Sequence, residues 1–118
     1  MEMTKLILNK KILVIIFVMS FFSGISQNID YSYLKAKSEF YYKNYNKALK
    51  NINNAIGIDK NNYRNYLLRG KIYLKQTKFD FAIKDFTKSN KLKQNSSNFY
   101  KAKAYCQIKD WENTNKYL

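Results

Sequence analysis

Apolar residues recur every three or four positions along the chain from about residue 30, which is the spacing of an amphipathic helix. Leu67, Leu68 and Ile72 follow this spacing, and so do Ala82 and Phe86. The chain has no proline and only three glycines, which also favours helices over a turn-rich β architecture. The pattern predicts an all-α protein with helices near residues 30–43, 46–58, 62–76, 79–92 and 96–109 and a short last helix from about 111 to 117.

The same apolar columns return after a fixed interval of 34 residues, because residues 36–59 align with residues 70–93 without a gap. The aligned pairs are Ala36 with Gly70, Phe40 with Leu74, Tyr45 with Phe79, Ala48 with Ala82, Ile52 with Phe86, and Ala55 with Ser89. A third copy begins near residue 98 at an offset of about 32, with Ala102 in the Gly/Ala column, Trp111 in the aromatic column and Thr114 in the Ala column. Such a repeat predicts stacked copies of one helical unit.

The small residues in these columns have a packing role. Two antiparallel helices approach to about 8 Å only where a residue with little side chain faces a bulky one. We expect Gly70 and Ala82 to be such close contacts, with bulky partners at Tyr73, Phe79 and Phe86. The structural positions predicted in this way are Ala36, Ala48, Ala55, Gly70, Tyr73, Ala82, Phe86 and Ala102.

This pattern resembles the tetratricopeptide repeat family, whose unit is a helix–turn–helix of 34 residues with small side chains at its eighth, twentieth and twenty-seventh places. The middle copy keeps the family's tyrosine place, at Tyr73, whereas Lys60 and Gln94 stand where a proline usually closes the unit. The resemblance implies a right-handed α-solenoid whose first helices line a concave, peptide-binding face. It implies about two and a half repeats, at residues 29–62, 63–94 and, incomplete, 95–118.

The N-terminus has the organisation of a secretory signal. Three lysines precede an apolar run at residues 12–22, and Gly24 and Ser26 follow at the spacing that a signal peptidase reads. We expect cleavage after Ser26, so that residues 1–26 are the signal and Gln27 begins a mature chain at 27–118 in the periplasm or outside the cell. A retained anchor is the alternative, although about 11 to 14 apolar residues fall short of the roughly 20 that span a bilayer.

The charge of the chain points to acidic partners. Lys and Arg number 22 against 8 Asp and Glu, which gives a net charge of +14. Two columns place basic and apolar side chains on one face of the first helices. With Arg64 and Lys75 beside them, the predicted groove residues are Tyr33, Lys37, Arg64, Leu67, Lys71, Lys75, Phe99 and Lys103.

Such a groove would bind an extended peptide that carries acidic or apolar side chains, and the chain would act as a protein-interaction scaffold. Other interpretations stay open: a merely solvated lysine face, an envelope module that binds anionic lipid or polysaccharide by charge, and the sensor part of a longer signalling protein. The C-terminal end, half covered in this layout, could also associate with a second copy. We do not expect nucleic-acid binding, because the lysines are scattered and form no known motif.

Several residue types that catalysis needs are missing. The chain has no histidine and one cysteine, Cys106, which we expect to be a small residue of the core or groove. Two close acidic pairs, Asp80 with Asp85 and Asp110 with Glu112, are expected to cap helices. The segment at residues 95–97 fits a glycosylation sequon, but we interpret it as a turn and helix cap. We therefore expect no catalysis, no cofactor and no metal site.

Overall fold

The computed structural model describes the backbone of residues 2–116 and the side chains of residues 2–21, 31–110 and 112. Within residues 2–116 the chain forms five helices and no strand, which confirms the all-α prediction. The helices are α1 (Glu2–Tyr41), α2 (Tyr45–Ile58), α3 (Tyr63–Lys75), α4 (Phe79–Leu92) and α5 (Asn98–Lys116).

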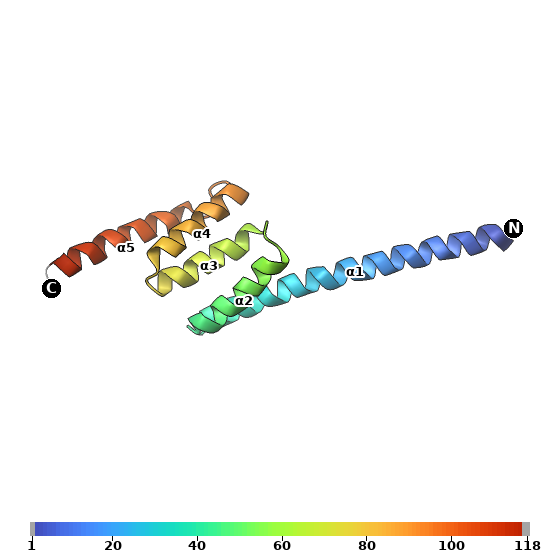
Figure 1. The fold of residues 1–118 in the computed structure, drawn as a ribbon, viewed down its shortest axis with the longest axis horizontal. Helices are drawn as coiled ribbons and strands as arrows, with labels where there is room; N and C mark the ends of the chain where they lie inside the picture. The colour runs from blue at the N-terminus through green and yellow to red at the C-terminus, as the bar shows by residue number, and fades with distance from the viewer. Residues whose placement is uncertain (1, 117–118) are drawn as a thin grey trace.

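The helices stack in chain order (Figure 1). The second half of α1 pairs with α2, α3 pairs with α4, and α5 packs on α4. Two helix hairpins and one further helix thus form the predicted right-handed α-solenoid of about two and a half repeats. The molecule is elongated, with principal dimensions of 87 × 28 × 16 Å, because the first half of α1 projects far beyond the stack.

Two buried clusters hold the stack together, and α3 contributes to both. The first joins Ala36 of α1 with Ala48, Ile52 and Ala55 of α2 and Leu68 and Ile72 of α3. The second joins Leu74 of α3 with Ala82 and Phe86 of α4 and Ala104 of α5. Each hairpin therefore buries its apolar stripe against the next element along the chain, as a stacked repeat requires.

Most of the predicted structural positions lie in these clusters. Six of them are buried, namely Ala36, Ala48, Ala55, Gly70, Ala82 and Phe86, and Tyr73 is half-buried. The closest approach is at Gly70: a Cβ added there would lie 2.5 Å from Cε1 of Phe86. Only glycine fits against this ring, so the spacing of small and aromatic residues sets how closely α3 and α4 pack.

Ala102 does not follow this prediction, since it is exposed. α5 is nevertheless docked in register: Ala104 lies 32 residues after Ile72, and both are completely buried. Ala102 therefore does occupy the place of Gly70 on its helix. It is exposed because no second helix of a third pair packs on it within the described residues.

The predicted turn near residues 108–112 and the separate helix after it are wrong, because α5 runs without a break to Lys116. A turn of the kind used in the first two pairs costs about 1–2 kcal/mol at a left-handed non-glycine residue. In those pairs the packing of a second helix offsets this cost, and no such packing is described here. Asp110 and Glu112 therefore lie inside a helix instead of capping one, and Cys106 is exposed. The side chains of Trp111 and Thr114 lie outside the described part.

Both hairpin turns use the same backbone geometry. Lys43 has φ 62° and Thr77 has φ 59°, and these residues are 34 positions apart. Each stands between two helices, where the left-handed conformation reverses the chain in three residues. The repeat therefore extends to the turns, although neither residue type favours a positive φ.

The first helix begins at Glu2, not near residue 30 as predicted, and passes through the expected cleavage position. No proline interrupts this stretch, so helical hydrogen bonding can continue into the first repeat. All described side chains from residue 2 to 21 are exposed, and the buried contacts of α1 begin only at Tyr33 and Ala36. Within the described residues, no helix has both the length and the apolar character needed to cross a membrane.

Candidate functional site

A pocket of about 120 Å³ lies between α1 and α3, the first helices of the two hairpins. Its lining consists of Tyr33, Lys37, Phe40, Arg64, Leu67, Leu68 and Lys71. Three of these residues lie about one turn apart on α1, and the other four lie along one face of α3. The structure thus brings together five of the eight predicted groove residues.

The pocket combines an apolar surface with basic side chains. Phe40, Leu67 and Leu68 supply the apolar part, whereas Lys37, Arg64 and Lys71 carry positive charge. No carboxylate is among the seven lining residues, so their charges add to one positive field. Such a site can accept an apolar side chain and attract acidic groups on either side of it.

Tyr33 adds a hydrogen-bonding group to the pocket. Burial raises the pKa of its phenol, an effect that the nearby Arg64 charge partly opposes. The phenol therefore keeps its proton at neutral pH and can donate a hydrogen bond. A half-buried phenol next to a cation suits a carboxylate or a carbonyl acceptor.

Arg64 stands at the start of α3, where the side chain of Asn62 accepts a hydrogen bond from its backbone N–H at 3.1 Å. Its Nε donates to the hydroxyl of Tyr63 at 3.5 Å, and Nζ of Lys93 donates to the same hydroxyl at 3.3 Å. These two cations lower the pKa of Tyr63. The sequence analysis missed Tyr63 and Lys93, which stand in none of the columns that were compared.

Lys71 connects the pocket with α5. Its Nζ lies 4.2 Å from the ring centroid of Tyr100, which stacks on Phe86 with centroids 5.8 Å apart. A cation over an aromatic face is attracted by the ring quadrupole. In this way α5 fixes a basic side chain of the pocket, a role for Tyr100 that the sequence did not reveal.

The other three predicted groove residues do not line this pocket. Lys75 is the last residue of α3, and Lys103 lies on α5; both are exposed. Phe99 is 72% exposed and meets only Tyr100 edge-on, with ring centroids 5.2 Å apart. Between α3 and α5 the contact of Lys71 with Tyr100 stands where the first interval has its cavity. The predicted groove is thus best formed between α1 and α3.

A second charged group is structural. Arg69 of α3 binds Asp85 of α4 through two hydrogen bonds of 2.7 and 2.8 Å, and its third contact is to Asn53 of α2 at 3.0 Å. Asp85 is 4% exposed, and its carboxylate raises the pKa of the Arg69 guanidinium. Asp85 therefore does not cap a helix, as the sequence analysis had expected, but joins three helices.

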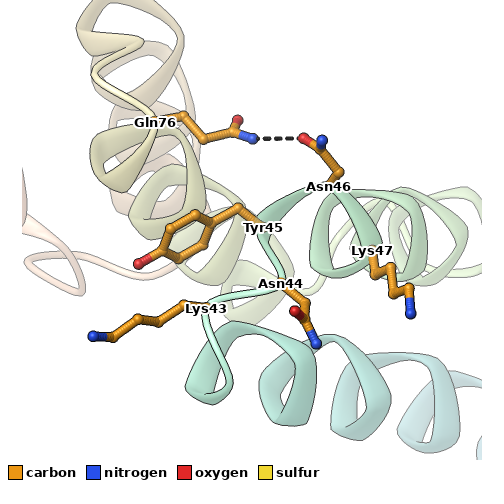
Figure 2. A pocket seen from close by; sticks show the side chains of 6 residues that line it. All are labelled: Lys43, Asn44, Tyr45, Asn46, Lys47 and Gln76. Atoms are coloured by element: carbon orange, nitrogen blue, oxygen red, sulfur yellow. Dashed lines mark hydrogen bonds between the residues drawn. The ribbon is translucent and has the colours of Figure 1, made fainter.

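The largest described cavity, about 450 Å³, lies beside the turn between α1 and α2 (Figure 2). It is lined by Lys43, Asn44, Tyr45, Asn46, Lys47 and Gln76. Gln76 donates a hydrogen bond to Asn46 at 3.0 Å, and the two lysines point away from each other. Because its cations diverge and none of the predicted groove residues reaches it, this cavity is the weaker candidate. Among the described side chains, no group of His, Cys, Asp and Glu could hold a metal ion.

Comparison with solved structures defines the class of fold. The chain is similar to the TPR domain of Arabidopsis OM64, with a TM-score of 0.68 and 20% sequence identity over 75% of this chain and 74% of that one. It is also similar to the TPR2B domain in the pHsp70 complex of yeast Sti1, with a TM-score of 0.67 and 24% identity over 74% and 71% of the two chains.

The class is that of α-solenoids built from helix hairpins. Within it, the chain has the tetratricopeptide-repeat fold, as the resemblance in its sequence implies. No family model matches the sequence, and no curated protein matches it significantly.

Proposed function

We propose that this chain is an exported interaction scaffold that binds acidic, extended peptide segments in the groove between α1 and α3, without catalysis of its own. The observation that carries the proposal is the pocket itself, in which Lys37, Arg64 and Lys71 surround an apolar surface. A scaffold role agrees with the fold, and the yeast Sti1 domain with this fold is found in a pHsp70 complex.

The expected affinity is modest. One solvated contact between a lysine and a carboxylate contributes at most about 1 kcal/mol, so the three cations together supply only a few kcal/mol. The remainder would come from an apolar side chain that fills the pocket, at about 1.5–3 kcal/mol. Binding should weaken as salt screens the charges.

The test uses the full chain and a fluorescent heptapeptide in which Glu alternates with Leu. Reversing Lys37 and Lys71 to Glu should weaken binding at least tenfold, because two attractive contacts become repulsive. The matched control reverses Lys50 and Lys84 to Glu, two exposed lysines of α2 and α4 that do not line the pocket. Since both variants have the same net charge, only the groove variant should lose affinity for the peptide.

Equal losses in the two variants would contradict the groove. If both variants also lose retention on vesicles of anionic phosphatidylglycerol, and the peptide does not bind, the chain is an envelope module that acts through its overall charge. That result would assign the function to the +14 charge of the whole molecule.

Export is the second part of the proposal. It rests on the three lysines, the apolar run and the small residues of the first 26 positions, and on the exposure of every described side chain from residue 2 to 21. A segment that contributes nothing to the core can be removed without loss of the fold. N-terminal sequencing of the chain from an exporting host should begin at Gln27, whereas a chain that keeps Met1 would contradict cleavage.

A further inference from the structure

One face of α5 is left without a partner. This open face, formed by Ala102, Tyr105 and Cys106, points away from α4; all three residues are exposed, Tyr105 by 54%. In Figure 1, α5 lies at the edge of the stack with α4 on one side only. The exposure does not come from loose docking, because Ala104 on the opposite face is completely buried.

The two earlier pairs show what covers the same face. Ala36 on α1 and Gly70 on α3 occupy the place of Ala102, and both are buried by the second helix of their own pair. In each case a bulky residue of that helix meets the small one: Ile52 for Ala36 and Phe86 for Gly70. The open face thus has the form that, twice in this chain, receives an antiparallel helix.

We propose that the open face of α5 binds an amphipathic helix of a separate partner protein, which takes the place of the second helix of the third pair. The size of the bulky residue on that helix follows from the small residue that it meets. Phe86 leaves no room for a Cβ at Gly70, where the added atom would be 2.5 Å away. Ala36, which has a Cβ, is paired with the aliphatic Ile52. Because Ala102 also has a Cβ, the partner helix carries an aliphatic residue there.

Charge specifies a second feature of the partner. Lys101 occupies the place of Arg69, whose guanidinium binds Asp85, the residue directly before Phe86. The partner helix therefore carries a carboxylate directly before its aliphatic residue, within reach of Lys101. The net charge of +14 disfavours a second copy of the chain as the occupant, since like charges repel.

The probe is a synthetic helical peptide with the sequence of α2, residues 45–58, in which Asn51→Asp places the carboxylate before Ile52. It is titrated onto the full chain, and binding is measured by fluorescence anisotropy and by the alkylation rate of Cys106, the only cysteine. We expect binding that slows alkylation at least tenfold at saturation. The peptide changes Ile52→Ala and Ile52→Phe should each weaken binding at least tenfold, the first by removing the contact and the second by clashing with Ala102.

The chain variant Ala102→Trp should also weaken binding at least tenfold, whereas Lys103→Trp, one position along but on the neighbouring face, should leave it unchanged. Absence of binding, or equal weakening by both tryptophans, would overturn the proposal. Slow alkylation of Cys106 before peptide is added would mean that the chain's own residues cover the face. Dimers that Ala102→Trp dissociates would assign the face to a second copy. Either result overturns the proposed partner.

Discussion

The contact between Gly70 and Phe86 determines how closely α3 and α4 approach. Phe86 is completely buried, so its ring cannot move aside into solvent. The corresponding contact in the first pair joins Ala36 with Ile52, in which a slightly larger residue meets a smaller one. Each pair thus conserves the sum of two side-chain sizes, and a change on one side should be compensated by a change on the other.

Gly70→Ala should therefore destabilise the protein. Overpacking costs about 1–3 kcal/mol, and the better helix propensity of alanine returns up to about 1 kcal/mol. We expect a net loss of about 1–2 kcal/mol in the free energy of unfolding, measured with urea. Gly57→Ala is the control, since nothing lies within 4 Å of an added Cβ there, and it should cause no loss.

Combining Gly70→Ala with Phe86→Ile recreates the pairing of Ala36 with Ile52. The double variant should lose less stability than the sum of its two single variants, because each change makes room for the other. Strict additivity would show that Gly70 and Phe86 are not coupled and that the close contact is not what selects glycine.

Asp85→Asn tests the second residue-scale feature, the ion pair with Arg69. Hydrogen bonds to charged groups contribute about 1.5–3 kcal/mol, and we expect a loss in that range because Asp85 is 4% exposed. Asp80→Asn is the matched control: Asp80 is exposed in the first turn of α4, where it interacts with the helix dipole for less than about 1 kcal/mol. Equal losses in urea unfolding would contradict a structural role for the pair.

At the scale of elements, the sequence predicted α2, α3 and α4 within one residue at each end. Their amphipathic pattern is strong, and each is bounded by a short polar segment. It could not predict where α5 ends, because that turn forms only if a second helix packs behind it. It also failed at the start of α1, since the apolar leader and the first repeat form one continuous helix. Local pattern thus specifies elements that pack on both sides, and not those at the ends of the stack.

The turns offer a prediction at this scale. Thr77 is β-branched and has φ 59°, a conformation that costs a non-glycine residue about 1–2 kcal/mol. Thr77→Gly removes this cost but increases the entropy of the unfolded chain, so we expect a net gain of about 0.5–1 kcal/mol in unfolding free energy. Lys78→Gly, at φ −89°, should lose stability instead. A loss in both variants would show that the left-handed turn is not strained.

At the scale of the whole molecule, the sequence predicted the repeat, the order of stacking and five of the residues that meet in the pocket. Columns 34 residues apart must face the same way in a regular stack, which is why this worked. Contacts between different columns could not be found in the same way. The ion pair of Arg69 with Asp85 and the contact of Lys71 with Tyr100 depend on how far long side chains reach across helices, which spacing alone does not specify.

The most direct test of a basic peptide-binding groove is an NMR titration of the isotope-labelled full chain with the alternating Glu–Leu heptapeptide. The account predicts that the amide shifts that change most belong to α1 and α3 around Lys37, Leu67 and Lys71, and that the changes shrink as salt is added. Shifts spread evenly over lysines on all helices, or no shifts around the pocket, would contradict it.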